Sequence, residues 1–236
     1  MHFKLTRWII IKKILVLIFL ILFGFTIYNI AFSPKDEYSL AKVYRLESSI
    51  VYDGDLSEEG IEQVKKLYSK DINNIILNSL GGEINLGMDL GEWIYDHKLD
   101  VTIKYAAFSS AANYIFPAGQ KKFLYKNSFI GWHGGATQEP TTFYEKLFVK
   151  FILNDYIKRS KIREENYFKK INVNPKITTL GQQEVYKKYE IEYKGWTYSL
   201  DTLNKLGIND VVLIDGEWSP ITEFEDAKLF VIETFD

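Results

Sequence analysis

Strand-like and helix-like segments alternate between residues 73 and 137, and this alternation limits the possible folds most strongly. Short apolar runs predict buried strands at Ile75–Asn78 and Val101–Tyr105. Between them, the segment Asn85–Lys98 repeats its apolar residues at helical spacing. A strand, a helix and a second strand in this order form a crossover unit, which joins parallel neighbours of one sheet. We therefore predict an α/β domain with a mostly parallel sheet flanked by helices.

The neighbouring segments extend this pattern in both directions. A strand is predicted at Val43–Tyr52, and Asp55 with Glu58 forms a capping-box signal for the helix that follows. Ser110–Ala118 predicts another short helix, and two short strands come after it. A long helix is predicted over Thr142–Lys170, with a wide apolar stripe that is rich in aromatic residues. This stripe predicts either packing within the protomer's own core or a contact between protomers of a homo-oligomer.

The chain begins with a basic segment followed by an apolar run. Residues 14–32 carry no charge, and a membrane-spanning helix needs about 20 apolar residues. The basic residues precede the run, and the positive-inside rule keeps such a flank in the cytoplasm. We expect a cytoplasmic segment 1–13, a transmembrane signal anchor 14–32, a linker 33–42 and a domain 43–236 on the extracytoplasmic (periplasmic) side of the inner membrane. The alternative is a cleaved signal peptide, although its apolar region is typically shorter, roughly 7–15 residues.

Composition and motifs exclude several classes of function. The chain has no cysteine, which excludes disulfides and thiolate chemistry. Its three histidines are scattered and lack zinc-ligand spacing, so we expect no metal and no other cofactor. A formal net charge of −2 gives no reason to expect a nucleic-acid partner. Neither a phosphate-binding loop motif nor a dinucleotide-binding fingerprint follows the glycine pair at 81–82.

Three short motifs follow or end predicted strands and carry residues for acyl-transfer chemistry. They are NSLGG at 78–82, SSAA at 109–112, and His133 after the apolar run 129–132. A glycine pair can offer backbone N–H groups at close range, because no Cβ obstructs the approach. A serine that opens a helix is accessible as a nucleophile, and histidine is the usual base for it. Taken singly, each motif has a simpler interpretation: a turn, a helix cap and a core histidine.

In combination, the order and spacing of these motifs resemble the Clp protease/crotonase superfamily, in its serine-peptidase branch. The resemblance covers about residues 43–210 and implies a ClpP/crotonase-like fold of repeated β-β-α units. In the family pattern, a strand leads to a Ser-Pro-Gly-Gly-like loop, and an Ala-Gly pair follows the nucleophilic serine by nine residues. Ser110 stands nine residues before Gly119, and two short strands then lead to His133.

This resemblance assigns roles to individual residues. It makes Ser110 the nucleophile and His133 the general base, with the backbone N–H groups of Gly82 and Ala111 as the oxyanion hole. Ser109 is the rival nucleophile, but only Ser110 keeps the nine-residue spacing. The resemblance also implies a polypeptide substrate.

Two positions depart from the family pattern. Leu80 stands where the family usually has proline. The place of the third triad member, an acid, falls on Gly195, and Glu192 lies three residues earlier. Glu192 is therefore the candidate third member, provided that its loop is rearranged. Without an acid, the tautomer and orientation of the histidine depend on another acceptor.

The leading hypothesis is a membrane-anchored serine endopeptidase that cleaves polypeptides outside the cytoplasm. A catalytically weak or inactive homologue that acts as a binding or assembly module is the alternative, because Gly195 stands in the place of the acid. An acyl-CoA enzyme of the crotonase branch fits the export signal less well, since CoA substrates are cytoplasmic. The signal-peptide-peptidase branch uses a Ser–Lys dyad, and the place of His133 favours the Clp-like branch.

Overall fold

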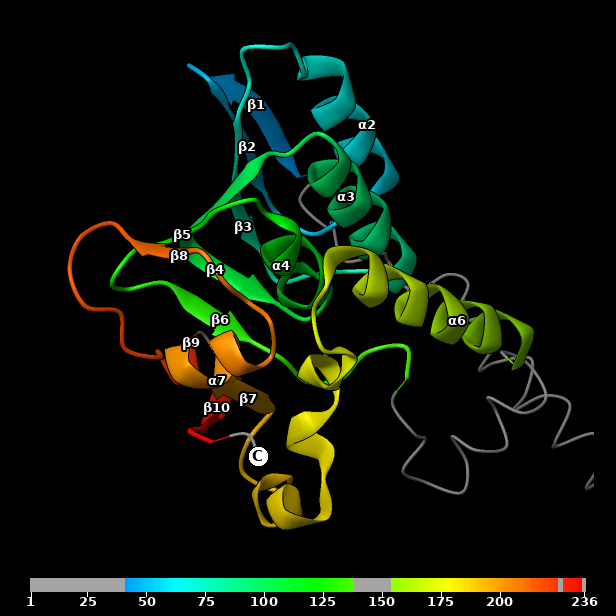
Figure 1. Ribbon diagram of the computed structural model, residues 1–236, viewed down its shortest axis with the longest axis vertical. Helices are drawn as coiled ribbons and strands as arrows, with labels where there is room; N and C mark the ends of the chain where they lie inside the picture. The colour runs from blue at the N-terminus through cyan, green and yellow to red at the C-terminus, as the bar shows by residue number, and fades with distance from the viewer. Residues whose placement is uncertain (1–40, 138–153, 225–226, 235–236) are drawn as a thin grey trace, which may run out of the picture. The chain divides into compact units, whose positions relative to one another are not determined.

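The computed structural model describes residues 41–137, 154–224 and 227–234 (Figure 1). These residues belong to one compact unit of the chain, Leu40–Asp236. The predicted anchor 14–32 and the first part of the predicted helix, residues 142–153, lie outside the described residues. No helix in the described part has the length and apolar character that a bilayer crossing requires.

The main sheet of the described part has seven strands in the order β1-β2-β3-β4-β5-β8, with β6 paired to β4. β1 is antiparallel to β2, and the other neighbours are parallel. The mixed α/β fold with a largely parallel sheet is thereby confirmed. The strands are β1 Lys42–Leu46, β2 Ser49–Asp53, β3 Asn74–Ser79, β4 Asp100–Phe108, β5 Lys122–Leu124, β6 Phe129–Gly131 and β8 Val211–Leu213.

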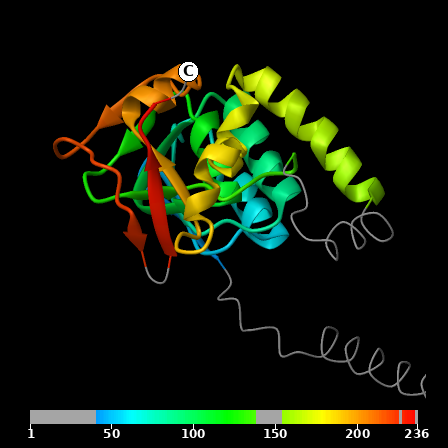
Figure 2. The same ribbon diagram turned by 90° about the horizontal axis from the view of Figure 1, so that it is seen from below.

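Helices cover one face of this sheet, and a small second sheet lies at the C-terminal end of the chain. Figure 1 shows α2 and α3 on the same side of β1, β2 and β3. Figure 2 shows β10 beside β7, with which it pairs in parallel. The remaining elements are α2 Glu58–Leu67, α3 Ile84–Asp96, a π-helix Ala111–Ile115, α4 Phe116–Ala118, α6 Asn154–Ile171, 3₁₀ turns at Pro175–Thr178, Leu180–Gln182 and Glu184–Tyr189, α7 Leu200–Lys205, and strands β7 Gly195–Tyr198, β9 Glu223–Phe224 and β10 Ala227–Ile232.

The alternation of side chains along the central strands explains which face the helices cover. Ile50, Ile75 and Val101 are register partners on β2, β3 and β4, and all three are fully buried. Successive side chains of a strand point to opposite faces, so register partners share a face. Burial of such large apolar side chains stabilises the fold by roughly 1.5–3 kcal/mol each.

Strand β4 is long enough to pair with two strands on the same side. Its first half pairs with β5 through Val101–Ile103, and its second half pairs with β6 through Ala106–Phe108. Both pairings are parallel, so the C-terminal ends of β4 and β6 meet at one edge. Ligand and catalytic sites of open α/β sheets lie beyond the C-terminal ends of the strands.

Two sequence-based predictions were wrong in detail, and a third was met only in part. The single strand predicted at Val43–Tyr52 is the hairpin β1–β2, whose turn is formed at Glu47 with φ of 53°. No glycine or asparagine marks this turn in the sequence, which explains the error. Helix α2 is capped by Ser57, whose Oγ accepts the Gly60 N–H at 3.0 Å, rather than by Asp55. The predicted β-β-α order fits β1-β2-α2, whereas β3 and β4 are each followed directly by a helix.

Candidate active site

A serine and a histidine meet beyond the ends of β4 and β6. The imidazole Nε2 of His133 lies 2.8 Å from the hydroxyl Oγ of Ser109, within hydrogen-bond distance. The register explains this meeting, because Phe108 at the end of β4 pairs with Gly131 at the end of β6. The Ser109 N–H extends the pairing by donating to the Gly131 carbonyl at 3.1 Å. Each residue thus follows a strand end whose position the sheet determines.

Ser109 occupies a sharp corner between strand and helix. Its φ is 56°, in the left-handed region that residues other than glycine rarely adopt. A non-glycine residue in this region costs of order 1–3 kcal/mol, and such residues cluster at active sites. A strained strand-to-helix turn also presents a nucleophile in hydrolases, where the corner exposes the serine oxygen. Ser109 is half-buried, which leaves its hydroxyl accessible at the site.

Ser110, the serine assigned from spacing, is placed differently. It is 1% exposed, and its Oγ donates to the Gly82 carbonyl at 2.7 Å. Its backbone already has helical dihedral angles, with φ of −61° and ψ of −24°. The structure therefore pairs His133 with Ser109, and the predicted Ser110–His133 hydrogen bond is corrected.

A π-helix accounts for the misleading spacing. The Phe116 N–H bonds to the Ala111 carbonyl, five residues back, where an α-helix bonds four residues back. This turn therefore contains one more residue than an α-helical turn. Ser109 stands ten residues before Gly119 rather than nine, and the extra residue is accommodated in the turn between them. π-turns of this kind are frequent at functional sites.

The Gly81-Gly82 loop lies against Ser109. A Cβ on Gly81 would lie 2.7 Å from the Ser109 Cβ, so only glycine allows this approach, and its φ of 103° favours glycine as well. The Leu56 N–H donates to the Gly81 carbonyl at 2.8 Å. In a trans peptide the N–H and C=O point in opposite directions, so the Gly82 N–H points away from Leu56.

The His133 ring is supported by an aromatic contact. It stacks on Phe108 with ring centroids 5.0 Å apart and an interplanar angle of 28°. The residue as a whole is exposed, but this packing removes part of the water around the ring. The partial burial lowers the pKa of His133 below its ordinary value. The imidazole therefore loses its proton at a lower pH than a free histidine does.

The predicted acid does not approach His133 in the described residues. Gly195 lies beside His133. A Cβ on Gly195 would overlap the Trp132 carbonyl and come within 3.2 Å of the His133 Cβ. The Trp196 N–H bonds to the Trp132 carbonyl at 2.8 Å, which holds β7 this close. Glu192 instead forms an exposed ion pair with Lys228.

A buried network behind the site escaped the sequence analysis. Glu164 of α6 is fully buried and accepts hydrogen bonds from Tyr114 and from two backbone N–H groups after His133. Asn113 donates to the Gly134 carbonyl at 2.7 Å. The sequence signal was weak, since a glutamate in a charged helix is most often solvent-exposed.

Neither a protein-family model nor a curated protein sequence matches the chain. Among solved structures, it is similar to a ClpP1 mutant from Listeria monocytogenes at 17% identity and a TM-score of 0.42, over 72% of this chain and 92% of that one. It is also similar to an enoyl-CoA hydratase from Thermoplasma volcanium GSS1 at 11% identity and a TM-score of 0.31, over 39% of this chain. The chain spans half the length of that hydratase.

Proposed function

We propose that this protein is a serine peptidase in which Ser109 is the nucleophile and His133 is the general base. The observation that carries the proposal is the 2.8 Å contact between His133 Nε2 and Ser109 Oγ. A serine hydroxyl is a weak nucleophile until an adjacent base accepts its proton. As Oγ attacks a peptide carbonyl, Nε2 takes the hydroxyl proton and then passes it to the departing amine. Water, activated by the same imidazole, then hydrolyses the acyl-enzyme and restores Ser109.

Two backbone N–H groups are proposed to stabilise the oxyanion of this reaction. The first is that of Gly82, which points away from Leu56, while the loop that carries it lies against Ser109. The second is that of Ser110, the residue after the nucleophile, and it replaces Ala111 in the sequence-based assignment. Removal of one such donor costs about 3–4 kcal/mol of transition-state stabilisation in a well-studied peptidase. The buried Ser110 hydroxyl supports this loop by donating to the Gly82 carbonyl.

The proposed mechanism is a Ser–His dyad. Among the described residues, His133 contacts Ser109 through its ring and has Gly195 of β7 near its Cβ. Glu192 forms an ion pair with Lys228 instead. In a triad, an acid holds the histidine tautomer and stabilises the imidazolium. The absence of such a contact among the described residues favours one alternative, a weakly active or inactive homologue that binds polypeptides. The two proposals differ in whether the serine is activated.

The substrate, assembly and location remain part of the proposal. The motif order, with its resemblance to the serine-peptidase branch, supports a polypeptide substrate. The aromatic-rich stripe, whose apolar residues fall between 143 and 152 of the predicted helix 142–170, supports a homo-oligomer, and it lies outside the described residues. The uncharged run 14–32 and its basic flank support an inner-membrane anchor with the catalytic domain outside the cytoplasm.

Labelling with a fluorophosphonate probe tests the nucleophile. The wild-type chain should react, Ser109→Ala should abolish the reaction, and His133→Ala should slow it at least a hundredfold. Ser110→Ala is the comparison variant. It keeps the Ser110 N–H and the Ser109–His133 contact but removes the hydroxyl that bonds to the Gly82 carbonyl, so labelling should fall without being abolished. Loss of labelling in Ser110→Ala with full labelling in Ser109→Ala would reverse the assignment. A folded wild type that does not react would favour the binding module.

Topology is tested separately in intact cells. External protease added to spheroplasts should digest the catalytic domain, whereas a cytoplasmic marker should survive. A domain that is cut only after lysis would contradict the extracytoplasmic location without affecting the assignment of the nucleophile.

A further inference from the structure

Helix α6 places a carboxylate in the interior, directly behind the candidate site. Glu164 is fully buried, and its Oε1 accepts the Tyr114 hydroxyl at 2.5 Å and the Ala136 N–H at 3.0 Å. Its Oε2 accepts the Thr137 N–H at 2.9 Å. All three donors are neutral groups. Burial of a carboxylate among neutral groups carries a large desolvation cost, so its contribution to stability alone is a weak explanation for its presence.

The three hydrogen bonds of Glu164 join two segments that carry the proposed catalytic residues. Tyr114 belongs to the π-helix that begins two residues after Ser109. Ala136 and Thr137 belong to the segment that follows His133. Glu164 thus links the chain behind the proposed nucleophile to the chain behind the proposed base, and Figure 1 shows the helix that carries it, α6, beside α3.

A second link runs parallel to the first. Asn113, which precedes Tyr114 in the π-helix, donates through Nδ2 to the Gly134 carbonyl at 2.7 Å. Two consecutive π-helix side chains therefore hold the segment 134–137, one directly and one through Glu164. The segment packs tightly at Gly135. A Cβ at this position would overlap Glu164 Oε1 and lie 2.8 Å from the Thr178 Cβ.

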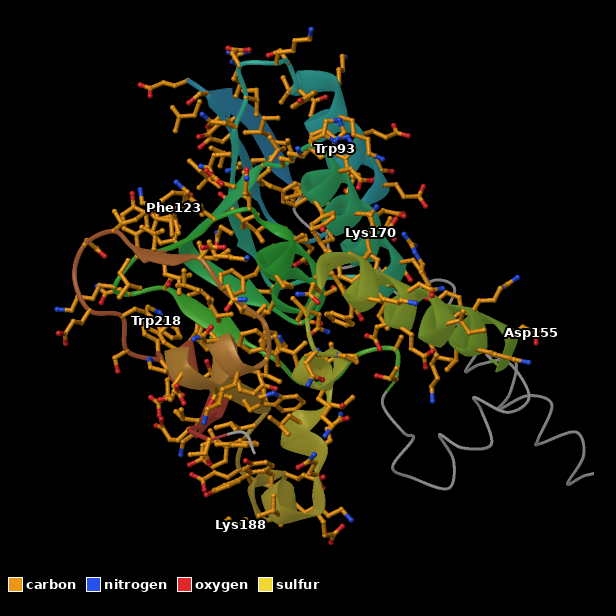
Figure 3. All side chains as sticks on the ribbon, in the orientation of Figure 1. Trp93, Phe123, Asp155, Lys170, Lys188 and Trp218 are labelled. Atoms are coloured by element: carbon orange, nitrogen blue, oxygen red, sulfur yellow. The ribbon has the colours of Figure 1, made fainter. Side chains whose placement is uncertain are left out.

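Helix α6 is itself anchored along its length. Arg163, the neighbour of Glu164, pairs with Asp89 of α3 at 2.5 Å. One turn beyond Tyr167, Lys170 pairs with Asp96 of α3 at 2.8 Å, and Figure 3 shows this lysine where α6 passes α3. Tyr167 donates to the Tyr114 carbonyl. These contacts fix the position of α6 and therefore the position from which the Glu164 side chain extends.

We propose that Glu164 is a positioning residue, which holds the segment 134–137 against the π-helix so that His133 Nε2 meets Ser109 Oγ. The catalytic importance of Glu164 depends on the proposed function. The hydrogen bonds by which it holds the segment do not depend on that function. It assigns to an interior carboxylate of α6 the orienting role that a triad acid would have, exercised through the backbone rather than through the imidazole.

The test compares full-length variants in detergent. Glu164→Gln keeps the shape of the side chain but replaces one acceptor oxygen by an NH₂ group, which cannot accept an N–H bond. We expect its fluorophosphonate labelling rate to fall at least tenfold. Tyr114→Phe removes one donor and leaves both backbone bonds, so a smaller loss, about two- to fivefold, is expected. Thr102→Val is the matched control, because it removes a partly buried hydrogen bond, from Thr102 Oγ1 to Asn74 Oδ1, near the other end of β4. It should leave the rate unchanged.

A readout independent of activity separates this inference from the proposed function. The imidazole resonances of His133 can be titrated by NMR in wild type, Glu164→Gln and Thr102→Val. When Glu164→Gln releases the segment, the ring gains water, and its titration midpoint should rise towards the ordinary value, whereas Thr102→Val should leave it unchanged. If wild type is not labelled but this midpoint still moves, the proposed function fails and the positioning role stands. An unchanged His133 midpoint with an unchanged labelling rate would overturn the inference. If Glu164→Gln does not fold, Tyr114→Phe decides by the same two measurements.

Discussion

The two sides of His133 are built differently. Towards the end of β4, side chains meet the ring: Ser109 Oγ lies 2.8 Å from Nε2, and Phe108 stacks on the ring face. Towards β7, the neighbour is backbone, since Trp132 and Trp196 exchange two hydrogen bonds of 2.8 Å and Gly195 contributes no side chain. The first side is suited to proton transfer, and the second side holds the base in place by packing and strand pairing.

In the proposed mechanism, this difference separates activation of the nucleophile from orientation of the histidine. A triad acid usually provides orientation and charge stabilisation together. Here orientation is available from the β6–β7 contact and from the segment after His133, whereas charge stabilisation by an acid is not seen among the described residues. Three measurements test the difference: a change in the loop beside Ser109, the pH dependence of His133, and removal of the Glu192 carboxylate.

The largest of these three effects is expected from Gly81→Ala. Its Cβ would lie 2.7 Å from the Ser109 Cβ and 2.8 Å from the Phe108 carbonyl, so the loop must move away from the nucleophile. The labelling rate of the folded protein should fall at least a hundredfold, because the loop carries the proposed oxyanion donor. The matched control is Gly216→Ala, which has a similarly positive φ of 126° but open space around its Cβ position. A folded Gly81→Ala variant with normal labelling would show that the loop takes no part in the reaction.

An intermediate effect is expected from pH. Partial burial lowers the pKa of His133, so the neutral imidazole persists to lower pH than for a free histidine. The labelling rate should be constant at neutral pH and fall about tenfold per pH unit below a midpoint that lies under about 6.5. A carboxylate beside the ring would raise this pKa by stabilising the imidazolium. A midpoint above about 7 would therefore reveal an acid that interacts with His133.

The smallest effect is expected from Glu192→Gln. Glu192 forms its ion pair with Lys228 at the surface, where its own side chain is 62% exposed. The labelling rate should stay within about twofold of wild type, and the free energy of unfolding should hardly change, as is usual for exposed pairs. Lys228→Gln, which removes the other partner, should give the same small change by urea denaturation. A tenfold loss of labelling in Glu192→Gln alone would place this carboxylate in the triad.

Local patterns in the sequence were sufficient to predict most of the fold. The buried strand near Ile75 and the helix that becomes α3 are specified by their own apolar spacing, so their positions were predicted closely. The β1–β2 hairpin was missed because Glu47 adopts a positive φ without a glycine or asparagine. Such a turn is imposed by the pairing of its flanking strands, which no short window of sequence contains.

The geometry of the candidate site differs from the expected one at two points, and both differences have physical causes. His133 and the Gly81-Gly82 loop come together with a serine, as their order along the chain indicated. The choice between Ser109 and Ser110 depended on counting residues through a helix. The sequence does not show that one turn of this helix is a π-turn with an extra residue. Glu164 was missed because its burial depends on the packing of α6 over distant segments.

The π-helix has a consequence for how related sequences should be compared. Consider an alignment with a chain that has an ordinary α-helical turn at this place. If the Ala118-Gly119 pair is matched and no gap is allowed, Ser110 rather than Ser109 falls opposite the nucleophile of that chain. An alignment anchored on the end of β4 makes the opposite choice and needs a one-residue insertion inside the helix. Insertions in loops are the ones that alignment methods expect. Catalytic residues inferred by residue counting should therefore be checked wherever two serines adjoin at a strand end before a short helix.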